Sequence, residues 1–215
     1  YVKGQETIEE AVSREVLACR RNVGVLDAST LGKLIVSGKD SGKFLDMIYT
    51  NMMSNLKPGK CRYGLICSEN GFLIDDGVVA RIDDISYLCH TTSGGAETIH
   101  SMMEEWLQTE WWDMNVYVTN VTEQFSQITI VGNNSRTVLE KLGARSVSEE
   151  AFPFMTWKNE NIAGIDVTIY RISFSGELAY EIAVPTQYGN SLFHTLLSEG
   201  KEFDAIPYGT EALGV

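Results

Sequence analysis

Cysteine, histidine and proline are scarce in this chain of 215 residues, which has four cysteines, three histidines and four prolines. No two cysteines form a C-x-x-C pair, and the three histidines, His90, His100 and His194, are scattered. We therefore expect no metal site. The cysteines at positions 19, 61, 67 and 89 lie in apolar or mixed segments, which favours buried, reduced thiols and a cytoplasmic location.

Basic residues are also few, since 17 Lys and Arg stand against 29 Asp and Glu and give a formal charge of -12. This balance argues against a nucleic-acid backbone or an anionic membrane as a partner. No apolar run approaches the roughly 20 residues that span a bilayer, and no basic-then-apolar leader opens the chain, so we expect a soluble, intracellular protein. The chain lacks an initiator Met and ends in "YGTEALGV", where a helix begins, so we expect a fragment of a longer protein.

Three common chemical signatures are missing. "GKDSGKFL" resembles a phosphate loop, but the spacing from Gly38 to Gly42 is wrong and Phe44 follows Lys43. No G-x-G-x-x-G follows a strand, which argues against a dinucleotide bound in a Rossmann turn. No G-x-S-x-G elbow is present, so a serine hydrolase is unsupported.

The patterns that are present predict alternating helices and strands. Residues 6–24 carry Ile8, Val12, Val16 and Cys19 at helical spacing, and short β-branched strands follow at 23–29 and 32–38. "LIVSGKDSGKFL" at 34–45 resembles "ITIVGNNSRTVL" at 128–139, each reading as a strand, a turn and a helix. The similarity indicates two units of related plan, unless two common units match by chance.

The segment after the first unit predicts a sheet of its own. Three strands are expected in 61–92, with Asn70-Gly71 as a hairpin turn, then a helix at 94–108 and a strand at 115–122. Strand-helix-strand-strand-strand-helix-strand suggests a ferredoxin-like layer of helices on an antiparallel sheet. Further on, 164–185 predicts two strands and 188–203 a helix. The fold class is therefore α+β.

Two adjacent acids interrupt the apolar stretch "NGFLIDDGVVAR". Strand side chains alternate between faces, so Asp75 and Asp76 should point to opposite sides of their sheet. An acid turned inward needs a hydrogen-bonding partner, which could be a ligand. The alternative is a tight turn in which both acids cap backbone amides in solvent.

A second acidic pattern occurs in "RISFSGELAYEIAV", where Glu177 and Glu181 lie four residues apart and so on one face of a strand. A glutamate that faces a pocket can accept two parallel N–H bonds from a flat heterocycle such as a pterin ring. The alternative for Glu181 is an ordinary acid on the surface of a strand.

Four ordered motifs resemble those of the aminomethyltransferase (T-protein) family of the glycine cleavage system. They are "REVLACRRNVGVLDAS", "YGLICSENGFLIDDGV", "FPFMTW" and "RISFSGELAYEI". The resemblance runs from about residue 5 to 215. It is closest to the folate-binding region of the alpha subunits of heterotetrameric sarcosine oxidases, and dimethylglycine dehydrogenases are similar there.

The resemblance implies two leaves of a cloverleaf of folate-binding domains with ferredoxin-like split βαβ units, the third leaf, a C-terminal barrel, being missing. Residues 1–36 and 117–215 would form the first folate-binding domain, and 37–116 an inserted ferredoxin-like domain.

The same resemblance assigns candidate site residues. Asp76 is the expected catalytic aspartate beside the folate N10, and Glu181 is expected to bind the edge of the pterin ring. The other expected folate contacts are Tyr63, Thr91, Phe154, Val78, Leu31 and Phe174. Phe174 replaces a tyrosine of the T-proteins, and Glu211 stands where they have an arginine, which fits the sarcosine oxidase branch.

The implied function is transfer of a one-carbon unit from sarcosine oxidation to tetrahydrofolate, giving 5,10-methylenetetrahydrofolate. Flavin and NAD would then bind only in parts of the complex outside this chain, and other sarcosine oxidase subunits would be its partners. Two alternatives remain open, a stand-alone methyltransferase of the T-protein family and a folate-binding module without catalytic activity. A dinucleotide-binding region upstream would favour the sarcosine oxidase function over the stand-alone methyltransferase.

Overall fold

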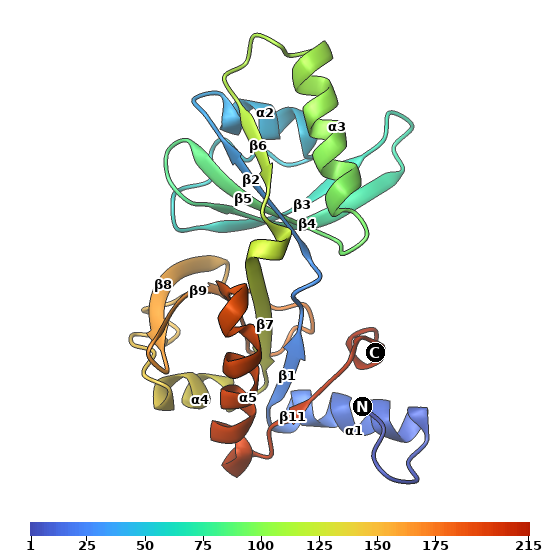
Figure 1. Ribbon diagram of the computed structural model, residues 1–215, viewed down its shortest axis with the longest axis vertical. Helices are drawn as coiled ribbons and strands as arrows, with labels where there is room; N and C mark the ends of the chain where they lie inside the picture. The colour runs from blue at the N-terminus through green and yellow to red at the C-terminus, as the bar shows by residue number, and fades with distance from the viewer. The chain divides into compact units, whose positions relative to one another are not determined.

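The computed structural model describes all of residues 1–215 and contains two separate β-sheets (Figure 1). Contacts divide the chain into two compact units. The first unit comprises residues 1–29, 125–154 and 158–215, and the second comprises 30–124 and 155–157. The fold is α+β, as the sequence predicts, and none of its helices is both long and apolar enough to cross a membrane.

The first unit is built on a six-stranded sheet with the order β11-β1-β7-β10-β9-β8. Its strands are β1 (Gly24–Asp27), β7 (Phe125–Val131), β8 (Thr156–Ile162), β9 (Ile165–Arg171), β10 (Ala179–Pro185) and β11 (Ile206–Pro207). Its helices are α1 (Ile8–Arg21), α4 (Ser135–Lys141), α5 (Gly189–Glu199) and α6 (Thr210–Leu213), with short 3-10 turns η2 (Thr186–Tyr188) and η3 (Lys201–Phe203). Strand β1 pairs parallel with β11 and antiparallel with β7, and β10 pairs antiparallel with β7 and β9.

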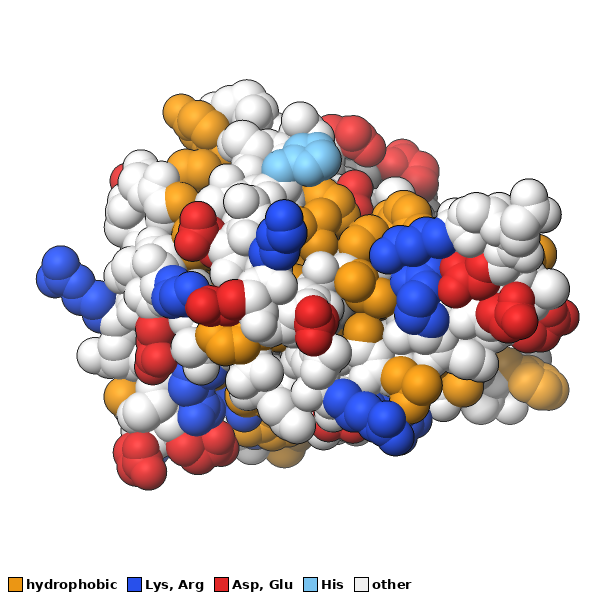
Figure 2. Space-filling view, turned by 90° about the horizontal axis from the view of Figure 1, so that it is seen from below, with side chains coloured by type: hydrophobic (Ala, Val, Ile, Leu, Met, Phe, Trp, Pro, Cys, Tyr) orange, Lys and Arg blue, Asp and Glu red, His pale blue; other side chains and the backbone are white.

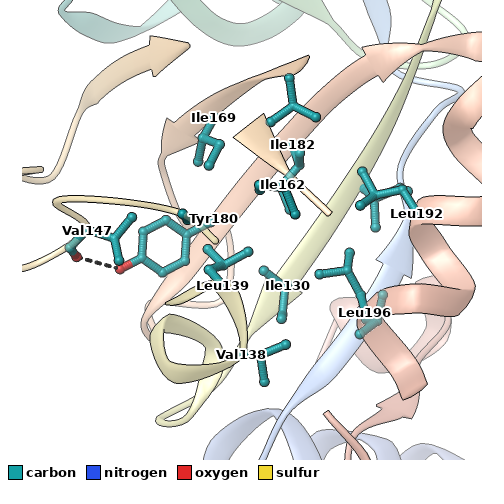
Figure 3. Close-up of a cluster of buried hydrophobic side chains, with 14 of the residues drawn as sticks. Ile130, Val138, Leu139, Val147, Ile162, Ile169, Tyr180, Ile182, Leu192 and Leu196 are labelled. Atoms are coloured by element: carbon teal, nitrogen blue, oxygen red, sulfur yellow. Dashed lines mark hydrogen bonds between the residues drawn. The ribbon is translucent and has the colours of Figure 1, made fainter. Parts of the chain in front are cut away.

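The core of this unit lies on one face of the sheet, under α4 and α5. Alternate residues of β7, β9 and β10, such as Ile130, Ile169 and Ile182, meet Val138 and Leu139 of α4 and Leu192 and Leu196 of α5 (Figure 3). Tyr180 is fully buried there, and its hydroxyl donates a hydrogen bond to the Val147 carbonyl oxygen. Because strand side chains alternate, the residues between these face the other side of the sheet.

The second unit contains a five-stranded sheet with the order β3-β4-β5-β2-β6. Its strands are β2 (Gly32–Ser37), β3 (Cys61–Cys67), β4 (Leu73–Arg81), β5 (Ser86–Thr91) and β6 (Tyr117–Asn120), and its helices are α2 (Ser41–Ile48), α3 (Ala96–Thr109) and the 3-10 turn η1 (Thr122–Gln124). The helices α2 and α3 cover one face of the sheet (Figure 1). This is the strand-helix-strand-strand-strand-helix-strand order that the sequence predicts.

The internal repeat has the same geometry in both units. Gly38 and Gly132 have φ angles of 119° and 116°, and a Cβ at either would lie 2.2 Å from a backbone oxygen. In the first copy the Gly38 amide and the Ser41 hydroxyl both donate to the Ile85 carbonyl. In the second, the Gly132 amide and the Ser135 hydroxyl both donate to the carbonyl of residue 178. The two turns are therefore one structural device used twice.

The structure differs from the expected elements and boundaries at two places and agrees at a third. Strand β8 was not expected, and its residues Lys158, Asn159 and Glu160 are polar. Strands β2 and β6 pair with each other in the second sheet, so the second unit extends beyond the expected boundaries of 37 and 116. Helix α1 begins and ends within its expected range, with a capping box between Thr7 and Glu10.

Candidate functional site

The two adjacent acids of β4 lie on opposite faces of the second sheet. Asp75 pairs across the strands with Ile66, which belongs to the core under the helices, whereas Asp76 pairs with Leu65 on the other face. Both acids are in regular strand rather than in a turn. The pairing therefore decides which acid is structural and which faces away from the core.

Asp75 is the structural acid, because backbone amides hold its carboxylate. The side chain is 3% exposed, and its Oδ1 accepts from the Asp76 amide at 2.9 Å and the Thr92 amide at 3.2 Å. Gly95 packs directly against the same carboxylate, since a Cβ at residue 95 would lie 2.0 Å from Oδ2. Asp75 thus joins β4 to the turn that precedes α3.

Asp76 makes a different contact. Its Oδ2 accepts a hydrogen bond of 2.5 Å from the hydroxyl of Tyr63, which is 50% exposed. Donation to the Asp76 carboxylate stabilises the protonated phenol and raises the pKa of Tyr63. The pair presents a carboxylate fixed by a tyrosine on a partly exposed sheet face, an arrangement that can accept a proton from a bound ligand.

The remaining expected residues of the second unit do not all lie beside Asp76. Val78 follows Asp76 by two residues and shares its face, and Leu31 directly precedes β2. Thr91 lies two residues after the core residue Cys89, so it points to the side of Asp75, where it is 2% exposed. Its hydroxyl donates to the neighbouring Thr92 carbonyl. The structure therefore separates Thr91 from the Asp76–Tyr63 pair.

Glu181 lies in the middle of β10, on the face of the first sheet opposite α4 and α5. It pairs with Thr129 of β7 on one side and Tyr170 of β9 on the other. The side-chain amide of Gln127 donates a hydrogen bond to its Oε2. Tyr208 also lies near Glu181. The pKa of its hydroxyl is raised mainly by burial, and to a smaller extent by the charges of Cys19 and Glu181.

One expectation about this strand was wrong. Glu177 was predicted to share a strand face with Glu181, but β10 begins at Ala179 and Glu177 lies in the preceding loop. Gly176 has a φ of 82°, and the amides of residues 176 and 177 donate to Ser173 and Ser175. These turn contacts end the strand pattern before residue 177.

Phe154 and Phe174 are both in loops and exposed, at 53% and 76%. Phe154 lies against the guanidinium of Arg171, with its ring centroid 6.0 Å away. The same guanidinium lies 5.2 Å from the centroid of the Tyr180 ring, on the core side of the sheet. The contact of Phe154 is therefore with Arg171, on the face of the sheet opposite Glu181.

Gln127 was missed by the sequence reasoning, although it is fully buried and touches Glu181. The available signal was its place in the alternating run of β7, opposite in face to the core residues Ile128 and Ile130. A single polar residue in such a run reads as an ordinary solvent-facing position.

Other features of the surface carry none of the expected residues. A groove of about 980 Å³ on the first unit is lined by Asn159, Asp166 and Thr168 among others. No group of three or more His, Cys, Asp or Glu side chains is arranged to hold a metal ion. On the face shown in Figure 2, acidic and basic side chains are interspersed rather than gathered by sign.

Comparison with known proteins gives the chain its relatives. The family model described as the GCVT N-terminal domain matches residues 1–215. The alpha subunit of sarcosine oxidase from Corynebacterium sp. (strain U-96) is 46% identical over 217 residues, covering 100% of this chain and 22% of that protein. The corresponding subunit from Rhizobium meliloti (strain 1021) is 40% identical over 99% of the chain and 22% of its own length. An aminomethyltransferase from Thermoanaerobacter pseudethanolicus is 29% identical over 94% of the chain and 54% of that protein.

Solved structures share the fold. The aminomethyltransferase T of the glycine cleavage system from Bartonella henselae superimposes with a TM-score of 0.80 at 21% identity, over 94% of this chain and 52% of that one. A chain of the heterotetrameric sarcosine oxidase from Corynebacterium sp. U-96 gives 0.65 at 15% identity, over 92% and 95%.

These matches confirm the family resemblance found in the sequence. The chain spans 22% of the length of the sarcosine oxidase alpha subunits it matches. With a family model covering residues 1–215, the chain belongs to the aminomethyltransferase-like family defined by the GCVT N-terminal domain.

Proposed function

We propose that this chain is the folate-binding part of a sarcosine oxidase alpha subunit, which transfers the one-carbon unit of oxidised sarcosine to tetrahydrofolate. The observation that carries the proposal is the Asp76 carboxylate, fixed by Tyr63 on the face of the sheet away from the core. The proposal also draws on the 46% identity to a sarcosine oxidase alpha subunit.

Asp76 serves as the proton acceptor in this proposal. A folate amine that attacks an electrophilic carbon must lose a proton, and a carboxylate within hydrogen-bonding distance can take it. Tyr63 keeps the Asp76 side chain in one orientation, and the raised pKa of Tyr63 favours the protonated hydroxyl that donates to it. General base catalysis of this kind typically contributes roughly 10²- to 10⁴-fold to a rate.

Glu181 serves as the acceptor for the pterin edge. An ionised carboxylate matches the amino group and adjacent ring N–H of a pterin, which are two parallel donors. The chemistry of the donor set thus fits tetrahydrofolate, with Asp76 and Glu181 as acceptors. When bound, tetrahydrofolate supplies the nucleophilic nitrogens and carries away the one-carbon unit.

The other roles expected from the sequence belong to the same proposal. Val78, Leu31, Phe154 and Phe174 are proposed as apolar contacts of folate. Thr91 is proposed only as a support for the turn beside Asp75, given its buried hydroxyl. Oxidation of sarcosine requires flavin and NAD sites outside this chain, and the other oxidase subunits are the proposed partners.

A second candidate function follows from the aminomethyltransferases, of which the one from Thermoanaerobacter pseudethanolicus is 29% identical over 94% of the chain. In that case the protein would transfer a methylene or methyl group without an attached oxidase. A dinucleotide-binding region in the longer protein would favour the oxidase, and its absence would favour the transferase. A binding module without activity is the third alternative, and retention of both Asp76 and Glu181 argues against it.

The direct test compares the products of the assembled oxidase, with all its subunits, when the full-length protein that contains this chain carries Asp76→Asn. With sarcosine and tetrahydrofolate, the unaltered protein should form 5,10-methylenetetrahydrofolate and glycine. The variant should oxidise sarcosine at the same rate but release formaldehyde instead, because folate no longer traps the one-carbon unit.

The matched control is Asp84→Asn, which neutralises an exposed acid in the turn after the same strand. Asp84 contributes its backbone carbonyl, not its carboxylate, to the contact with Arg81, so the control should behave as the unaltered protein. Undiminished methylenetetrahydrofolate from Asp76→Asn would refute the role of Asp76. No methylenetetrahydrofolate from the unaltered protein would refute the proposed function.

A further inference from the structure

We propose that Gln127 is a positioning residue for Glu181, present to orient and hold its carboxylate for the ligand rather than to stabilise the fold. This inference rests on the proposed function for the identity of the ligand. It goes beyond that function because it concerns a residue that does not itself have to touch folate.

The register of the sheet brings the two side chains together. Strands β7 and β10 are antiparallel, with Gln127 opposite Ala183 and Thr129 opposite Glu181. Gln127 and Glu181 are thus diagonal neighbours on one sheet face, within reach of long side chains. Backbone bonds fix Gln127 in place, since its amide donates to the Ser29 hydroxyl and its carbonyl accepts from the Ala28 amide.

The orientation of the Gln127 amide is set by chemistry. Its Nε2 donates to Oε2 of Glu181, and the flipped amide would instead turn a carbonyl oxygen toward a carboxylate oxygen. Because a carboxylate can only accept, only the observed orientation is attractive. The hydrogen bond therefore runs from Gln127 to Glu181 and favours the ionised glutamate.

The carbonyl oxygen of the Gln127 side-chain amide is in an unfavourable environment. Gln127 is 0% exposed, and its Oε1 is buried without a hydrogen-bond partner. A buried acceptor without a partner lowers stability, and an apolar side chain of similar shape would remove that loss. Gln127 is therefore unfavourable for folding but donates a hydrogen bond to a candidate ligand-binding acid. We infer that it is present because it positions Glu181.

Several titratable groups lie in the part of the first unit that holds Glu181. Tyr170 pairs with it across the strands, and the charges of both Glu181 and Cys19 act on the hydroxyl of Tyr208. Burial raises the pKa of Cys19 to about 12, and the pKa of Tyr208 is raised as well. The carboxylates of Glu15 and Glu177 also act on the pKa of Cys19, so the titration has to follow the carboxyl carbon of Glu181 itself.

The test uses Gln127→Met, which keeps the length of the side chain and removes both polar atoms, in the full-length protein. The carboxyl carbon of Glu181 is followed by NMR titration, and tetrahydrofolate binding by anaerobic calorimetry between pH 5 and pH 8. We expect Glu181 to titrate at higher pH in the variant. We also expect affinity at neutral pH to fall about tenfold, as for one lost charge-assisted hydrogen bond. The acidic limb of binding should move to higher pH.

Two further measurements separate positioning from structure. The unfolding midpoint of Gln127→Met should be unchanged or raised, and in a Glu181→Gln background the same substitution should have no added effect on binding. An unchanged Glu181 titration would overturn the inference. So would a lowered unfolding midpoint accompanied by an equal loss of affinity at every pH. If the unaltered protein binds no tetrahydrofolate, the proposed function fails, and the NMR titration alone still decides whether Gln127 holds Glu181.

Discussion

At the scale of single residues, neighbouring acids have opposite tasks. Asp75 is buried, and its carboxylate accepts hydrogen bonds from the amides of Asp76 and Thr92. The carboxylate of Asp76 instead accepts a hydrogen bond from the hydroxyl of Tyr63, which is half exposed. The division follows from strand alternation, which turns one acid to the core and the other away from it. Substitutions at the two positions should therefore affect different properties.

Asp75→Ala should reduce stability much more than Asp76→Ala. Removing the buried carboxylate leaves two backbone amides without their acceptor, and we expect a loss of about 2–4 kcal/mol in the free energy of unfolding. Asp76→Ala should cost less than about 1 kcal/mol, since Asp76 makes a partly exposed contact. Urea unfolding of both variants measures the difference, and equal losses would contradict the assignment of Asp75 as the structural acid.

The raised pKa of Tyr63 supplies a second prediction at this scale. The Asp76 charge and hydrogen bond disfavour the phenolate, so the pKa of Tyr63 lies above its ordinary value and should fall toward it in Asp76→Asn. NMR titration of the Tyr63 ring carbon bonded to the hydroxyl would follow this change. The same carbon in Asp84→Asn serves as the control, and a pKa that stays raised in Asp76→Asn would show that another group causes the shift.

At the scale of elements, the repeated turn requires glycine at two distant positions, Gly38 and Gly132, for the same structural reason. Both have φ angles that disfavour any residue with a Cβ, and both pack against a backbone oxygen, that of Asn115 for Gly38 and that of Asn22 for Gly132. The sequence pattern of strand, glycine, two polar residues and serine predicts this turn twice, and the structure has it twice.

Gly38→Ala and Gly132→Ala should each destabilise the unit that contains them by about 3 kcal/mol or more, because backbone strain and a close contact add together. Gly59 and Gly164 are matched controls, since their φ angles are 82° and 81° but a Cβ there would meet nothing within 4 Å. Alanine at either control should cost only about 1–2 kcal/mol. Thermal unfolding of the four variants tests whether close packing adds to the cost.

Most elements could be predicted from the sequence because their period or punctuation is strong. The helical spacing of apolar residues in α1, the Asn70-Gly71 turn and the repeated Gly-x-x-Ser turn are local signals. Strand β8 was missed because its own side chains are largely polar, although its neighbour in the sheet, β9, follows it after only two residues. Glu177 was misassigned for a related reason, since a turn built on serine hydroxyls ends the strand pattern where the sequence still alternates.

The candidate site was predictable only in part. The opposite faces of Asp75 and Asp76 follow from strand geometry alone, and the structure confirms them. The burial of Thr91 and the contact between Gln127 and Glu181 depend on strand register, which one sequence does not specify. The ligand contacts of all these residues remain predictions.

At the scale of the whole molecule, each unit has a sheet with its main core under two helices on one face, α4 and α5 in the first unit and α2 and α3 in the second, and a candidate ligand-binding acid on the other face. In the first unit this acid is Glu181, and in the second it is Asp76. All four cysteines are free thiols, and three of them, Cys19, Cys61 and Cys89, are buried. Only Cys67 is partly exposed.

This distribution of thiols predicts their reactivity. Burial raises the pKa of Cys19 and of Cys89 to about 12, so neither is a thiolate at neutral pH. In the native 215-residue chain, Cys67 should react first with a disulfide reagent such as Ellman's reagent, and the other three only as the protein unfolds. Cys67→Ser should remove the fast phase. A fast phase that survives in this variant would show that a second thiol is accessible.

The central claim is that Asp76 and Glu181 are the acids that bind tetrahydrofolate. The measurement that tests it most directly is anaerobic calorimetric titration of the full-length protein with tetrahydrofolate, beside Asp76→Asn and Glu181→Gln. The account predicts saturable binding with a micromolar Kd, weakened roughly tenfold or more in each variant, as expected for a lost hydrogen bond to a charged group. Full affinity in either variant, or no binding by the unaltered protein, would contradict it.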